Sequence, residues 1–127
     1  MVLIRPVLLL LAAAGIACAP PASSGRAARN ANLITQAELT ASGHTNLYDA
    51  IANLRPAFFR SRGRSTFDNT VSDYPPVYQD GQRYGEIETL RSISIEHVKQ
   101  VRFLSASDAT TKYGTNHTAG AIEVVTR

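Results

Sequence analysis

The residue types that carry most protein chemistry are present in this sequence, but they do not occur at catalytic spacing. His44, His97 and His117 are far apart, and no acid or cysteine accompanies them at the spacing of a metal site. The chain has no G-x-S-x-G, H-E-x-x-H, P-loop or G-x-G-x-x-G run. Asp80 has no partner acid or histidine at a diagnostic separation, and the serines form no Ser–His–Asp set. The sequence therefore predicts no catalytic residue, no metal site and no cofactor.

Two groups of residues are candidates for binding a ligand or a partner. Arg60, Arg62 and Arg64 alternate with small residues. Charges with a period of two suit one exposed strand face, so the pattern favours a solvated sheet edge. The alternative is a basic strand or loop that faces an acidic ligand or partner. The second candidate is the pair Asp80 and Gly81, although an Asp-Gly pair is also typical of a tight turn.

The composition bounds the class of protein. The 127 residues include 13 basic and 10 acidic side chains, for a formal charge of +3. Loss of a leader through Ala17 would remove only Arg5 and leave +2. This charge is too small and too dispersed to indicate nucleic-acid binding, and no nucleic-acid-binding motif accompanies it. The length predicts one domain and a leader.

The first 17 residues have the pattern of a secretory signal. A single basic residue, Arg5, precedes the apolar run Val7–Ala14, and small residues follow. The apolar run is too short for a comfortable transmembrane helix. We therefore expect residues 1–17 to be a signal peptide and the mature chain to lie in a bacterial cell envelope.

Cys18 is the one cysteine of the chain, so no intramolecular disulfide can form. The run Gly15-Ile16-Ala17-Cys18 resembles a bacterial lipobox, although Gly15 stands where leucine is usual. The alternative is ordinary cleavage near Ala14. Because Ala19 is not an inner-membrane-retaining aspartate, a lipidated Cys18 would anchor the chain at the outer membrane. The expected location is therefore the outer membrane, or the periplasm if the chain is not lipidated.

Residues 18–31 are rich in Pro, Ala, Ser, Gly and Arg, and we expect them to form a flexible tether. Leu33 and Ile34 then begin the folded part in a short strand. Asn46 is the expected N-cap of an amphipathic helix that ends before Pro56. Pro76–Gly81 reads as a strand that ends in an Asp-Gly turn.

The last thirty residues predict a strand, a short helix, a glycine turn and a strand. Val98–Leu104 mixes β-branched and polar residues, as a half-buried strand does. Ser105 or Ser107 caps the expected helix Ala106–Tyr113, which Gly114 ends. Gly120 opens the final strand, Ala121–Thr126.

This stretch resembles the C-terminal half of the plug domain of TonB-dependent outer-membrane receptors. The family run "I-E-x-I-E-V-L-K-x-x-S-A-T-x-x-Y-G-x-x-x-x-x-G-V-I-x-I-x-T-K" lies over Val98–Arg127 without a gap. Tyr113, Gly114 and Gly120 match its most specific positions, and we expect them to have structural roles. Lys99 and Arg102 replace the two glutamates of the run. The matching positions are Val98, Val101, Phe103, Leu104, Ala109, Thr110, Tyr113, Gly114, Gly120, Ile122, Val124, Thr126 and Arg127.

Three earlier segments also resemble plug sequences in family order, so the resemblance covers residues 32–127. It implies a small α+β plug-like domain with a mixed sheet of about four strands and two or three short helices. A receptor barrel needs about 22 strands of about 9–11 residues each, so we expect a stand-alone plug without its own barrel.

The resemblance implies a non-enzymatic envelope protein linked to outer-membrane uptake. Its expected partner is an outer-membrane barrel, another envelope protein or a small ligand, with a membrane anchor at Cys18. One alternative is a free-standing structural or interaction lipoprotein with no transport role. A small enzyme is a third, and it would require Asp80, a histidine and a serine to converge in the fold.

Overall fold

The computed structural model describes residues 30–61 and 73–127. The predicted signal peptide, the tether through residue 29, Cys18, Arg62 and Arg64 lie outside the described residues. None of the described helices is long and apolar enough to cross a membrane.

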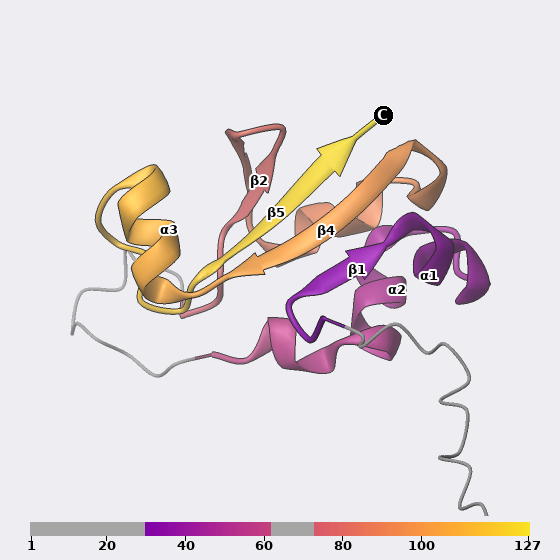
Figure 1. Ribbon diagram of the computed structural model, residues 1–127, viewed down its shortest axis with the longest axis horizontal. Coiled ribbons are helices and arrows are strands. Elements are labelled where there is room, and N and C mark those ends of the chain that lie inside the picture. Colours follow the sequence, from indigo (N-terminus) through magenta and orange to yellow (C-terminus); the bar gives the residue numbers. More distant parts are fainter. Residues whose placement is uncertain (1–29, 62–72) are drawn as a thin grey trace, which may run out of the picture.

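A five-stranded mixed sheet forms the centre of the molecule (Figure 1). Its strand order is β1-β4-β5-β2-β3. The pairing of β2 with β5 is parallel, and the other three pairings are antiparallel. The strands are β1 (Leu33–Thr35), β2 (Val77–Gln79), β3 (Gln82–Gly85), β4 (Val98–Leu104) and β5 (Ala121–Thr126).

Three α-helices and three 3₁₀ segments complete the described fold. The α-helices are α1 (Gln36–Ala41), α2 (Leu47–Leu54) and α3 (Ala106–Tyr113). The 3₁₀ segments are η1 (Pro56–Phe59), η2 (Ile87–Ser92) and η3 (Ile95–His97).

Each α-helix begins at a polar residue whose side chain accepts a backbone N–H of the first turn. Thr35, Asn46 and Ser105 hold these positions for α1, α2 and α3. Such caps satisfy N–H groups that have no partner inside the helix and contribute about 1 kcal/mol each. In α1, Glu38 also accepts the backbone N–H of Thr35, which completes a capping box.

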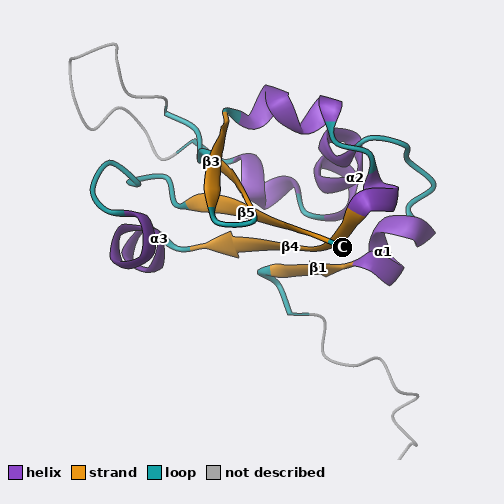
Figure 2. Cartoon of the chain, turned by 90° about the horizontal axis from the view of Figure 1, so that it is seen from above, coloured by secondary structure: helices purple, strands orange, loops and turns teal. Residues whose placement is uncertain are grey.

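The main core lies between one face of the sheet and a layer formed by α1, α2, η1 and η2. In Figure 2, α2 lies above the sheet, whereas α3 lies at the far end of β4 and β5. The alternate residues Ile122 and Val124 of β5 are both fully buried in this core, as a strand with one covered face requires. The buried residues of this core are Ile34, Leu39, Leu47, Ala50, Ile51, Phe58, Val77, Ile87, Leu90, Ile93, Val98, Val101, Ile122 and Val124.

A β-bulge explains why Val98 and Val101 of β4 both face the main core although they are three residues apart. The pairing of β4 with β5 shifts between Val98 and Gln100, so one extra residue, Lys99, is inserted into β4. Beyond the bulge, the alternation is regular, and Arg102 and Leu104 point to the opposite face of the sheet.

The predicted α+β class with a mixed sheet is confirmed, with five strands where about four were expected. The additional strand is β3, a short strand at the edge of the sheet. The helix α1 was not predicted, although Thr35 and Glu38 have the spacing of a capping box. The sequence predicted that the stretch with the three arginines, residues 58–67, is a strand or loop. This prediction is wrong at its start, because Pro56 begins a 3₁₀ segment that buries Phe58 and ends at Phe59.

Candidate functional site

The motif residue Tyr113 packs against Tyr78 in a second, smaller core on the other face of the sheet. The two rings are stacked with centroids 3.7 Å apart and an interplanar angle of 8°. Ala109, Leu104 and Ala121 surround them, so α3 is attached to β2, β4 and β5. The stack links the Tyr-Gly motif to the strand that precedes the Asp-Gly turn.

Glu123 is the charged centre of this cluster. It lies on β5, is only 7% exposed, and accepts hydrogen bonds from the Nζ of Lys112 and from the Tyr113 hydroxyl, the latter at 2.8 Å. Arg102 is its cross-strand neighbour on β4. A buried carboxylate that accepts two hydrogen bonds and faces two cations satisfies the usual requirement for burying a charge.

The pKa values of these residues reflect the same contacts. Burial disfavours the charged form of Glu123, but the hydrogen bonds from Lys112 and Tyr113 and the charge of Arg102 outweigh it and lower the pKa of Glu123. The hydrogen bond to Glu123 raises the pKa of Lys112. Burial, followed by the hydrogen bond to Glu123, raises the pKa of Tyr113. At neutral pH, Glu123 is therefore an ionised carboxylate, Lys112 a charged ammonium and Tyr113 a neutral phenol.

His117 closes the cluster from the loop that follows α3. Its ring is nearly buried, with Nδ1 2.8 Å from the Gly114 carbonyl and Nε2 2.7 Å from the Tyr78 hydroxyl. Because the carbonyl only accepts, we assign the proton of the neutral ring to Nδ1, so Tyr78 donates to Nε2. His117 thus fixes the loop onto β2.

Two motif glycines have backbone conformations that side chains disfavour. Gly114 ends α3 with φ +91°, as predicted for a residue just past a helix, and Gly120 has φ +85°. A Cβ at Gly120 would overlap the Leu104 carbonyl and lie 2.8 Å from Cζ of Phe103. Gly120 is therefore required both by its dihedral angle and by the close approach of β4.

The Asp80-Gly81 turn connects β2 to β3 and also holds the end of β5. The carboxylate of Asp80 accepts the backbone N–H of Thr126 at 2.9 Å and its hydroxyl at 2.6 Å. These two bonds lower the pKa of Asp80. Asp80 has φ +49°, a conformation that aspartate tolerates better than most residues. The predicted turn at this pair is present, and the hydrogen bonds of Asp80 extend beyond it to β5.

The predicted site residues do not gather at one place. The structure brings together Tyr113, Gly114 and Gly120 around α3 and the start of β5, whereas Asp80 and Gly81 lie at the other end of β2. Arg60 is exposed at the end of η1. No hydrogen bond among the described residues joins Asp80 to a histidine or a serine, since its two partners both belong to Thr126.

Sequence reasoning missed the contributions of Lys112, His117 and Glu123. Lys112 was not identified as a partner of Glu123, and His117 was treated as isolated because its partner Tyr78 is 39 residues away. Glu123 at the middle of an otherwise apolar strand was the available signal, because a charge there requires a partner.

The described residues show no grouping of three or more His, Cys, Asp or Glu side chains that would hold a metal ion. The polar groups of the cluster around Glu123 bond to one another. This arrangement holds α3 and the loop that follows it against the sheet.

The comparisons with known proteins find similarity among solved structures. No protein-family model matches the sequence, and no curated protein matches it. Among solved structures, the fold is similar to the ferric-catecholate import receptor Fiu from E. coli K12, with a TM-score of 0.48 and 24% sequence identity. The similarity covers 75% of this chain, which spans 14% of that receptor chain.

Proposed function

We propose that this protein is a non-enzymatic plug-like module of the bacterial envelope, which serves outer-membrane uptake by docking to a barrel. In the family that the sequence resembles, a plug domain fills a barrel and rearranges during energy-dependent uptake. A barrel-forming protein of the outer membrane is thus the proposed partner. Lipidation at Cys18 is the proposed means of holding the module at that membrane.

One observation carries the proposal. The run from Val98 to Arg127 matches the plug run without a gap, and its landmarks fall at the boundaries of β4, α3 and β5. Tyr113 ends α3, Gly114 follows with positive φ, and Gly120 precedes β5. A chance match of isolated letters would not place each motif residue at the position where its physical property is needed.

A departure from the family run has a local reason that keeps the proposal consistent. Arg102 stands where the run carries glutamate, and its cross-strand neighbour is the nearly buried Glu123. A glutamate at position 102 would place two like charges directly opposite each other, which is destabilising. The exchange of charge at position 102 thus suits the carboxylate on β5.

The proposal is tested by affinity purification of the tagged chain from solubilised native envelopes, followed by mass spectrometry. A matched bait carries residues 1–31 fused to an unrelated folded domain, so that proteins captured through the leader or the lipid alone appear with both baits. Recovery of a barrel-forming protein with the full chain only is the expected result.

Two variants of the plug-like domain show whether capture of the barrel depends on its native packing. Tyr113→Phe keeps the stacked ring and removes one hydrogen bond, so it should retain the barrel, whereas Gly120→Ala should lose it together with the native packing of α3. If the folded, envelope-located full chain brings down no barrel, the uptake role is wrong. A free-standing structural or interaction lipoprotein would then be the better description.

A further inference from the structure

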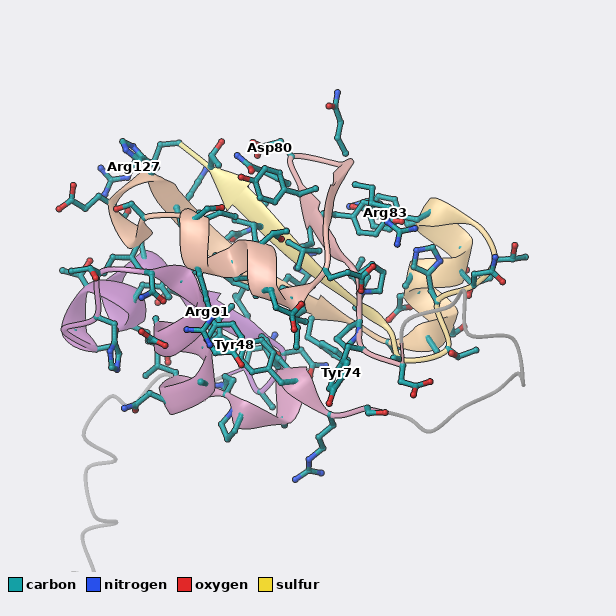
Figure 3. All side chains as sticks on the ribbon, turned by 180° about the vertical axis from the view of Figure 1, so that it is seen from behind. Tyr48, Tyr74, Asp80, Arg83, Arg91 and Arg127 are labelled. Carbon is teal, nitrogen blue, oxygen red and sulfur yellow. The ribbon has the colours of Figure 1, made fainter. Side chains whose placement is uncertain are left out.

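A polar pocket lies at the end of the sheet where β5 terminates, away from α3 and its buried cluster. Its volume is about 410 Å³, and it is open to solvent. Three segments that are distant in sequence form it: the β2–β3 hairpin, the stretch from η2 to η3, and the end of β5. Figure 3 labels Arg127 and Asp80 at this end of the molecule.

The pocket offers several hydrogen-bonding side chains that the described part of the chain leaves unused. Gln79, Ser94, His97 and Arg127 line it, and their side chains form no hydrogen bond or ion pair with the described residues. Together they present an amide, a hydroxyl, an imidazole and a guanidinium to the same space. This set can both donate to and accept from a ligand that has several oxygens.

Among the lining side chains, the permanent charge is positive. Arg127 is a permanent cation, and no acidic side chain lines the pocket. The carboxylate of Asp80 accepts hydrogen bonds from the backbone N–H and the hydroxyl of Thr126, another lining residue. A guanidinium in this position favours a carboxylate, which it binds with two parallel hydrogen bonds.

Tyr84 supplies an apolar wall. It is 45% exposed, lines the pocket, and its hydroxyl is 3.2 Å from the Ser92 hydroxyl, which steadies the ring. An exposed aromatic ring with a fixed orientation offers a flat apolar face beside polar groups. A sugar ring has a matching apolar face formed by its C–H groups and a rim of hydroxyls.

We propose that this pocket binds an acidic monosaccharide, with the carboxylate on Arg127, the ring against Tyr84, and the hydroxyls on Gln79, Ser94 and His97. The volume lies within the range of about 300–1,000 Å³ that is usual for small-ligand sites. The inference does not depend on docking to a barrel, because each of its residues belongs to this chain.

The test is an NMR titration of the full chain at pH 7 with D-glucuronate. Two probes isolate the parts of the ligand: D-glucose has the ring without the charge, and acetate has the charge without the ring. We expect saturable shifts at Tyr84, Ser94 and Thr126 with a Kd on the order of 1 mM for glucuronate. Glucose and acetate should each bind at least tenfold more weakly.

Variants locate the binding. Arg127→Gln and Tyr84→Ala should each weaken glucuronate binding at least tenfold, whereas the control Arg83→Gln should leave it unchanged. Arg83 is also an exposed arginine, and it lies beside Tyr84 on the β2–β3 hairpin. It pairs with Glu86 and does not line the pocket. Absence of saturable binding, equal binding of acetate, or an equal effect of Arg83→Gln would each overturn the proposal.

Discussion

The hydroxyl of Tyr113, the last residue of α3, donates a hydrogen bond of 2.8 Å to Oε1 of Glu123 in the middle of β5. The bond joins the motif helix to the central part of the sheet and helps to keep a nearly buried carboxylate charged. Tyr78 stacks on the same ring and connects it to His117. Stability at this end of the fold should therefore depend on a few polar contacts as well as on apolar burial.

The first prediction concerns the Tyr113 hydroxyl. Tyr113→Phe should lower the free energy of unfolding by about 1 kcal/mol, because it removes a partly buried hydrogen bond to a charged acceptor and keeps the ring. The matched control is Tyr84→Phe, whose exposed hydroxyl contacts only Ser92 and should matter by less than about 0.5 kcal/mol. Urea unfolding measures both; equal effects would contradict the assignment.

The second prediction separates dihedral strain from steric overlap. Gly81 and Gly120 both have φ +85°, but a Cβ at Gly81 meets open space, whereas one at Gly120 overlaps β4. Gly81→Ala should cost about 1–2 kcal/mol of stability for the left-handed conformation alone. Gly120→Ala should cost at least about 2 kcal/mol more, since backbone of β4 must move. Similar losses in chemical denaturation would show that the overlap does not matter.

The third prediction follows from the lowered pKa of Asp80. A carboxyl whose pKa is lower in the folded state contributes stability above its unfolded pKa of about 3.9, and this contribution disappears as pH falls through the folded pKa. Asp80→Asn should therefore lower the urea midpoint at pH 7, and the difference from wild type should shrink below about pH 4. A difference that stays constant from pH 7 to pH 2.5 would exclude the charge of Asp80 as its cause.

The fourth prediction concerns Lys112. Burial of Glu123 favours its neutral form, and the hydrogen bond from Lys112 is the strongest contact that opposes burial. Lys112→Met should therefore raise the pKa of Glu123, and acid unfolding should begin at a higher pH. A ¹³C NMR titration of the Glu123 carboxyl measures this directly. Lys99→Met is the control, since Lys99 is exposed at the bulge of β4; an equal shift there would contradict the specific role of Lys112.

The local signals of the sequence predicted most of the fold. Caps at Asn46 and Ser105, the break at Pro56 and the glycines around β5 each act through neighbouring backbone, so their effects can be read from adjacent residues. The bulge at Lys99 was not predictable in the same way. It depends on the pairing of β4 with β5, which no local pattern specifies.

The cluster around Glu123 shows why the site was only partly predicted. Tyr113 and Gly114 were identified through the family run, but their partners Tyr78 and His117 come from segments that meet only in the folded sheet. The same holds for the pocket beside Arg127, which three separate segments form. Sequence patterns locate elements, whereas contacts between distant elements follow from the topology.

The most direct test of the central claim is photo-crosslinking in intact cells from three exposed positions on different sides of the domain. Arg102 lies on the sheet face, Glu88 on η2 of the helical layer, and Thr115 beyond α3. A plug is enclosed by its barrel, so all three positions should crosslink to one and the same barrel-forming outer-membrane protein. Crosslinks from a single face, or to no barrel-forming protein at any position, would contradict the proposed plug function.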